Sequence, residues 1–164
     1  IGTFLERYSC SEDIAMKRQD GFSLIELLIV VAIVMIISAL AVPGLLRAKR
    51  YAQSGSAVQS LRTITTAENL YERRHKVYAT LADLAPEGTI DPHIAVGIKS
   101  EYTFTLSLVL DANDIAKGKV LTFKAYAAPQ QDTATGTFFF VDESAVIRFK
   151  QGSAADASSE PIPR

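Results

Sequence analysis

The sequence has few side chains that could do chemistry, and one of them lies in an unexpected place. Glu26 comes immediately before a run of twenty residues, 27–46, that contains no charged side chain. A carboxylate at the edge of an apolar segment is unfavourable unless it stays near polar headgroups, is neutralised or meets a cation. The position of Glu26 therefore needs a physical reason beyond membrane anchoring.

The other candidates for chemistry are scattered. The only histidines are His75 and His93, both expected at a helix end or in a loop, and the sequence contains no nucleophile-elbow or phosphate-loop motif. Asp83, Glu87 and Asp91 could suggest calcium, but their spacing does not match a calcium loop, so solvated acids are favoured. We therefore expect no catalytic, cofactor or metal site, and an enzyme is disfavoured.

The element that must position Glu26 is an apolar helix. At about 1.5 Å per residue, residues 22–46 would extend roughly 37 Å, which exceeds the roughly 30 Å hydrocarbon core of a bilayer. Apolar residues occur on all sides of this helix, which predicts a transmembrane segment. Basic side chains flank the run on both sides, Lys17 and Arg18 before it and Arg47, Lys49 and Arg50 after it. The distribution of charge therefore leaves the orientation open.

Two simpler functions for this segment compete. A secretory signal peptide would end in a small-residue cleavage site, and Ala41-Val42-Pro43-Gly44 is only a loose match to one. An ordinary signal anchor is the second alternative. Neither alternative has a use for Glu26.

The residues around Glu26 carry a specific resemblance. Residues 17–33 read KRQDGFSLIELLIVVAI, which resembles the processing site and N-terminal helix of the type IV pilin superfamily, whose members include type IV pilins and the pseudopilins of type II secretion. The resemblance implies cleavage by a prepilin peptidase between Gly21 and Phe22, N-methylation of Phe22 and a role for Glu26 in subunit assembly. Every position of the motif is matched.

In such a filament the N-terminal helices pack in an apolar centre. There Glu26 would pair with the terminal ammonium of Phe22 on a neighbouring subunit. Such a pair would fix the register between neighbouring helices more than it would add stability. The implied partners are further copies of the chain, the prepilin peptidase, an inner-membrane assembly platform with its ATPase, and the lipid bilayer before assembly. The implied location is the bacterial inner membrane, as a single-pass protein, and then an extracellular pilus.

Residues 1–21 are expected to be a leader that is removed on maturation. The stretch that begins at Met16, MKRQDG, is a plausible complete leader, so we hypothesise that residues 1–15 are an upstream extension. Removal of the leader would take away Cys10, the only cysteine, so no disulfide is expected. Residues 22–164 hold 14 basic and 14 acidic side chains, a balance that does not indicate nucleic-acid binding.

Pro43 and Gly44 are the helix-breaking residues of the apolar segment. Proline lacks an amide donor and clashes with the carbonyl of Ala39, so a kink is expected at Pro43 and Gly44. The residues alone leave open whether the helix ends there, whereas the resemblance implies that it continues. Beyond Leu45 an amphipathic stripe recurs at three- and four-residue steps: Ala57, Leu61, Ile64, Ala67 or Glu68, and Tyr71.

After a connecting region, residues 77–100, the apolar period changes to two. Strands are expected at 102–110, 119–127, 137–142 and 145–150, forming a four-stranded antiparallel sheet. Packing of this sheet on the helical stripe gives an α+β, type IV pilin-like fold. The globular domain is expected to cover residues 47–150, followed by a flexible tail at 151–164.

Three functions stay open. The favoured one is a structural subunit of a type IV pilus used for adhesion, motility or DNA uptake. The first alternative is a type II secretion pseudopilin, and the motif does not separate the two. The second is a membrane-anchored binding module that does not polymerise, and Glu26 counts against it.

Overall fold

The computed structural model describes residues 21–110 and 120–163. The expected leader, apart from Gly21, and the turn between the second and third strands therefore lie outside the described residues. The chain divides into two units, Ile1–Pro43 and Gly44–Arg164, which are described separately.

The first unit contains the N-terminal part of a single long helix. Helix α1 covers Leu24–His75, 52 residues, and contains Pro43 in its interior. The expected continuation of the helix past Pro43 is thus confirmed. From Gly21 to Pro43 every residue is exposed in the isolated chain, so this segment has no core of its own.

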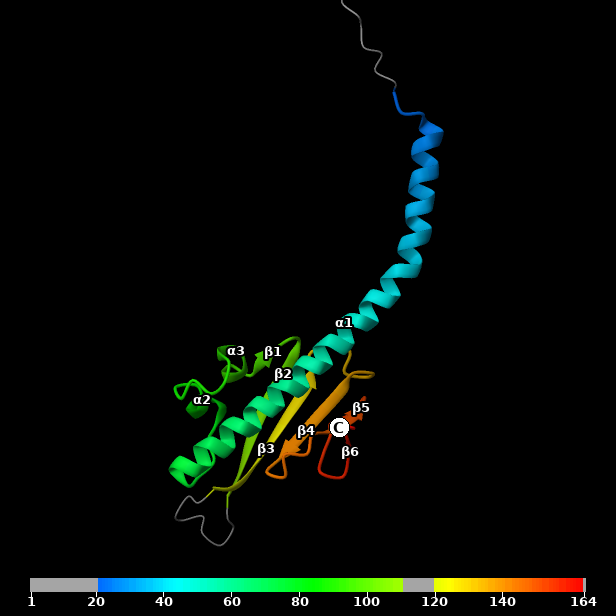
Figure 1. Cartoon of the computed structure of the whole chain (residues 1–164). Helices are drawn as coiled ribbons and strands as arrows, with labels where there is room; N and C mark the ends of the chain where they lie inside the picture. Colours follow the sequence, from blue (N-terminus) through cyan, green and yellow to red (C-terminus); the bar gives the residue numbers. More distant parts are fainter. Residues whose placement is uncertain (1–20, 111–119, 164) are drawn as a thin grey trace, which may run out of the picture. The chain divides into compact units, whose positions relative to one another are not determined.

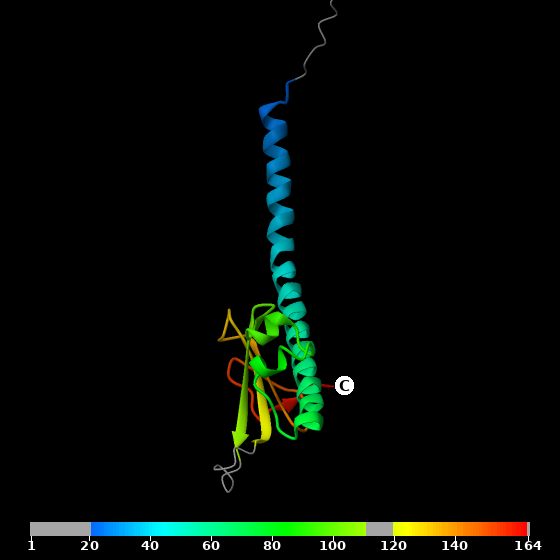
Figure 2. The same ribbon diagram turned by 90° about the vertical axis from the view of Figure 1, so that its left-hand side faces the viewer.

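In the second unit, the C-terminal half of α1 lies along one face of an antiparallel sheet (Figures 1 and 2). The predicted stripe is confirmed, because Ala57, Leu61, Ile64, Ala67 and Glu68 are all buried. Apolar burial of this kind is the main source of helix stability in a folded domain, and it ties this half of the helix to the sheet.

The sheet has six strands in the order β1-β2-β3-β4-β5-β6, with every neighbouring pair antiparallel. Their bounds are β1 Ile98–Lys99, β2 Tyr102–Leu110, β3 Val120–Pro129, β4 Thr137–Asp142, β5 Arg148–Gln151 and β6 Glu160–Pro161. The prediction of four strands is therefore wrong in number. The two additional strands, β1 and β6, contain two residues each, which is too short to show a period of two in the sequence.

The core lies between α1 and this sheet. Phe104 of β2, Phe123 of β3 and Phe139 of β4 are buried against the helix stripe, within one apolar cluster. Tyr78, which follows α1, adds an aromatic contact with Phe123, with ring centroids 5.2 Å apart. The alternation expected for the strands is thus the pattern that builds the core.

Two short helices occupy the connecting region. Helix α2, Leu81–Leu84, begins with a capping box in which Thr80 and Asp83 bond each other's backbone amides. Helix α3, Pro92–Ala95, begins after Asp91, whose side chain accepts a hydrogen bond from the His93 backbone N–H. These caps give the loop an ordered path beside α1 towards β1 (Figure 1).

Candidate functional site

The predicted cleavage site lies outside the helix. Gly21, Phe22 and Ser23 precede α1, and the backbone N–H of Leu27 donates to the Ser23 carbonyl oxygen at 3.1 Å. Phe22 is 75% exposed, and a Cβ added to Gly21 would meet no atom within 4 Å. The bond between Gly21 and Phe22 is therefore unobstructed, although cleavage and methylation there stay predictions.

Glu26 lies in the first turn of α1 and is exposed. The N-terminal end of a helix carries partial positive charge, which favours a carboxylate at this place. Among the ion pairs of the described residues, none includes Glu26. Its predicted pairing with Phe22 is intermolecular, so a single chain does not test it.

The helix around Glu26 presents apolar side chains on every side. Leu24, Leu28 and Leu40, for example, are 79%, 62% and 79% exposed. Within the described residues one helix, α1, is long and apolar enough to cross a membrane, and its most apolar window is wholly unburied. Exposed apolar surface of this extent requires a bilayer or other apolar helices around it.

Pro43 and Gly44 lie within this helix, and a Cβ added to Gly44 would meet no atom within 4 Å. Pro43 cannot donate to the carbonyl oxygen four residues earlier, so one helical hydrogen bond is missing there. The kink predicted at Pro43 and Gly44 stays a prediction.

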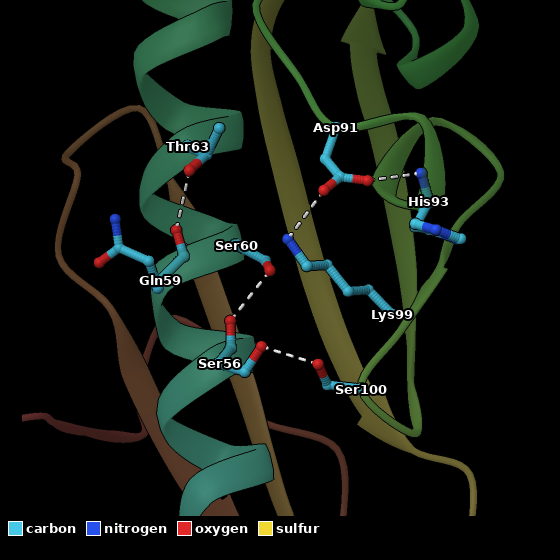
Figure 3. Close-up of polar contacts among 8 residues, drawn as sticks. All are labelled: Ser56, Gln59, Ser60, Thr63, Asp91, His93, Lys99 and Ser100. Atoms are coloured by element: carbon cyan, nitrogen blue, oxygen red, sulfur yellow. Dashed lines mark hydrogen bonds and ion pairs between the residues drawn. The ribbon is translucent and has the colours of Figure 1, made fainter.

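One polar contact joins the connecting region to α1, and two others hold the region itself together (Figure 3). The hydroxyl oxygens of Ser56 on α1 and Ser100 after β1 lie 2.8 Å apart. Lys99 donates from Nζ to Asp91 Oδ2 at 3.2 Å, while Asp91 Oδ1 accepts from the His93 backbone N–H at 2.8 Å. The hydrogen bond from His93 and the one from Lys99 lower the pKa of Asp91. Asp91 therefore acts as a cap and an anchor for the loop.

The three acids considered for calcium do not converge. Asp83 belongs to the capping box of α2, and hydrogen bonds from Thr80 lower its pKa. Glu87 instead accepts from Arg74 at 2.5 Å. In the described part of the chain no group of three or more His, Cys, Asp or Glu side chains is placed to hold a metal ion.

The histidines occupy structural positions. His75, at the end of α1, stacks on Tyr71 with ring centroids 4.2 Å apart, and its Nε2 lies 3.4 Å from Glu87 Oε1. His93 is exposed on α3. The basic end of α1 thus joins the helix to the connecting loop through Glu87, where cations also meet the negative end of the helix.

The spacing predicts either Ala67 or Glu68 on the buried stripe, and the structure buries both, but the sequence does not predict what Glu68 contacts. Glu68 is fully buried on the α1 stripe, and its Oε2 accepts a hydrogen bond from the Ala79 backbone N–H at 3.0 Å. Its Oε1 has no hydrogen-bond partner in the part of the chain that the structure describes. Burial raises the pKa of Glu68 to about 7, against the opposing hydrogen bond from Ala79. The signal in the sequence that could have indicated this buried carboxyl group is a glutamate within an otherwise apolar stripe.

Comparison with known proteins bears on the N-terminal segment first. Residues 16–42 match the family described as the prokaryotic N-terminal methylation motif. This match includes Gly21, Phe22 and Glu26, the residues to which the resemblance assigned processing and assembly.

A second comparison finds a named protein that is similar to part of this chain. The chain is 35% identical over 65 residues to the type II secretion system core protein G of Vibrio cholerae serotype O1 (strain ATCC 39315 / El Tor Inaba N16961). The match covers 40% of this chain and 44% of that protein, less than half the length of the relative. Motif, relative and pilin-like α+β layout together support the type IV pilin superfamily. They also support anchoring in the inner membrane.

Proposed function

We propose that the chain is a structural subunit of a type IV pilus. A prepilin peptidase would cut it after Gly21 and methylate Phe22, and the mature protein would wait in the inner membrane. An assembly platform with its ATPase would then draw subunits into an extracellular filament used for adhesion, motility or DNA uptake.

The observation that supports this proposal most strongly is the combination of exposed apolar surface and one carboxylate in the first unit of the chain. Its helix is apolar on every side and wholly exposed in the isolated subunit, yet it carries Glu26 in its first turn. A bilayer covers the apolar side chains and leaves Glu26 to the headgroup region, whereas a bundle of neighbouring subunits also offers Glu26 a fixed partner, the amino group of Phe22. Self-association therefore accounts for both features.

The second candidate is a subunit of a type II secretion pseudopilus. It is favoured by one specific observation, the similarity to the type II secretion system core protein G. Both candidates need the same processing site, the same membrane-held state and the same self-packing of α1. They differ in the length and location of the filament and in the machinery around it.

Processing is tested by mass spectrometry of the mature protein. We expect an N-terminus at Phe22 that carries one methyl group. Gly21→Val is expected to leave the protein unprocessed without disturbing the fold, since a Cβ at Gly21 meets no atom within 4 Å. An unmodified N-terminus upstream of Gly21 in the wild-type protein would contradict the proposal.

Electron microscopy of sheared surface filaments, with identification of the subunit, tests the pilus assignment. Long surface filaments built from this chain support a pilus. A genetic neighbourhood with a secretin and further pseudopilins, without surface filaments, supports the pseudopilus. Processed protein that never polymerises in either setting would leave the non-polymerising binding module as the function.

A further inference from the structure

A pocket of about 450 Å³ lies within the second unit, between α1 and the parts of the sheet that begin β2 and β4. Its α1 wall carries three cations, Arg47, Lys49 and Arg50, which we call the basic collar. The collar begins directly after the uncharged run 27–46. Membrane segments usually have an excess of Lys and Arg on one side only, whereas this segment has cations next to both ends. The cations of the collar therefore need a separate explanation.

Two cations of the collar are paired within the domain. Lys49 Nζ lies 2.7 Å from Glu101 Oε1, and Arg50 Nη1 lies 2.8 Å from Asp132 Oδ2. Arg47 lines the same pocket, and among the described residues no ion pair includes it. The pocket therefore has three cations against two carboxylates, and its excess positive charge belongs to Arg47.

The pocket also contains uncharged polar groups, on α1 and on the sheet. Tyr102 donates from its hydroxyl to the Thr137 carbonyl oxygen at 3.0 Å, and the Ser54 hydroxyl lies 3.1 Å from the same Tyr102 oxygen. Burial raises the pKa of Tyr102, so this hydroxyl stays neutral. A pocket with these hydroxyl groups and an excess cation suits a hydrated anionic group better than an acyl chain.

The place of the collar in the chain determines which anion it meets. Helix α1 is continuous from Leu24 to His75, and Arg47 is the first charged residue after the apolar run. When that run spans a bilayer, Arg47 lies within about one helical turn, roughly 5.4 Å, of the point where apolar side chains end. This is the depth of lipid headgroups, whose phosphates an arginine can bind through two parallel hydrogen bonds.

We propose that this pocket binds the phosphodiester headgroup of an anionic phospholipid, with Arg47 as the principal cation. Lys49 and Arg50 form its rim, held in place by Glu101 and Asp132. The proposal goes beyond the role in a filament and rests on that role only in requiring that residues 27–46 span the bilayer. The bound lipid would hold the second unit at the membrane surface until the subunit leaves for the filament.

The test uses the full chain in nanodiscs that contain equal amounts of phosphatidylglycerol and phosphatidylethanolamine. After transfer to a mild detergent, native mass spectrometry counts the lipids that remain bound. We expect phosphatidylglycerol to be retained over phosphatidylethanolamine by about fivefold, the preference given by one cation at an anionic surface. Arg47→Gln should reduce this ratio to nearly one.

Arg62→Gln is the matched control, since Arg62 is an exposed arginine of α1 that does not line the pocket. It should leave the lipid ratio unchanged. An equal loss in both variants would overturn the proposal, because the effect would then depend on overall charge. Equal retention of phosphatidylglycerol and phosphatidylethanolamine by the wild-type protein would by itself overturn the proposal.

This experiment is independent of filament assembly. A processed chain that forms filaments but retains both lipids equally would contradict the lipid site alone. A chain that retains phosphatidylglycerol but never forms filaments would contradict the filament role alone.

Discussion

The buried carboxyl group of Glu68 accepts a hydrogen bond from the backbone N–H of Ala79, at 3.0 Å from Oε2. The two residues belong to α1 and to the loop that follows it, so this bond fixes the direction in which the chain leaves the helix. Because a carboxylate buried in an apolar stripe is unfavourable, the contact ties the local fold to the protonation of Glu68.

Folding stability should therefore depend on pH through Glu68. Its pKa of about 7 in the folded protein lies above the ordinary 4.5, so the folded state binds this proton more tightly than the unfolded state does. The stabilisation is fully present below about pH 4.5 and is lost as the pH rises to about 7. At 1.36 kcal/mol for each pKa unit, we expect a loss of about 3 kcal/mol. Urea unfolding in detergent at several pH values measures it.

Glu68→Gln is the control for this prediction, because it keeps the shape and the acceptor oxygen for Ala79 but does not titrate. Other acids, such as Asp83 and Asp91, have lowered pKa values and destabilise the fold only at lower pH. The difference between wild type and Glu68→Gln isolates the effect of Glu68. Equal slopes against pH in the two proteins between pH 5 and 7 would contradict the prediction.

The core stripe of α1 makes a second prediction. Leu61 is fully buried, whereas Leu70 on the same helix is 38% exposed. Leu61→Ala should lower the free energy of unfolding by about 2–5 kcal/mol, since it leaves a cavity in the core. Leu70→Ala removes the same atoms at a position where no closed cavity forms, so its effect should be well under half as large. Equal losses in denaturant unfolding would show that the helix does not pack on the sheet as described.

The periodic parts of the fold could be predicted from the sequence. Steps of three and four residues placed Leu61 and Ile64 on the buried stripe, and alternation placed Phe104 and Phe123 in the core. Side chains on the buried face of an element are apolar one after another, so the periodic pattern is strong over the whole element. Long elements with one buried face are for that reason the parts that sequence patterns describe well.

Contacts between distant residues could not be predicted in this way. Lys49 and Glu101 lie 52 residues apart, and nothing local to either residue indicates the other. Strand β6 contains two residues, and it is defined only by its pairing with β5. The matched motif at residues 16–42, in contrast, is contiguous and can be read from the sequence, whereas the pocket beside the collar forms only through tertiary packing.

Gly55 offers a third prediction, on helix propensity. It lies exposed within α1, and a Cβ added there meets no atom within 4 Å. Gly55→Ala should stabilise the folded protein by about 1 kcal/mol, because glycine is the poorer helix former and loses more backbone freedom on folding. Thermal unfolding followed by circular dichroism in detergent measures the change.

Gly97→Ala is the counterpart of Gly55→Ala. Gly97 has a φ of +84°, and its added Cβ would lie 3.0 Å from the Phe104 carbonyl oxygen. The same substitution should therefore destabilise the protein there, by more than about 1 kcal/mol. A stabilising effect at Gly97, or a destabilising one at Gly55, would contradict the backbone geometry described for these residues.

Glu26 makes the last prediction, on assembly. Glu26→Ala should be inserted and cleaved normally, because the apolar run and the bond between Gly21 and Phe22 are unchanged. In the filament centre it would leave the ammonium of a neighbouring Phe22 buried and unpaired, a loss of about 3–5 kcal/mol for each subunit. Filament yield in sheared preparations should then fall by at least about tenfold. Glu26→Gln should be equally defective, since it keeps the shape but not the charge. Filaments at wild-type yield from Glu26→Gln would mean that the side chain acts through its shape rather than through an ion pair.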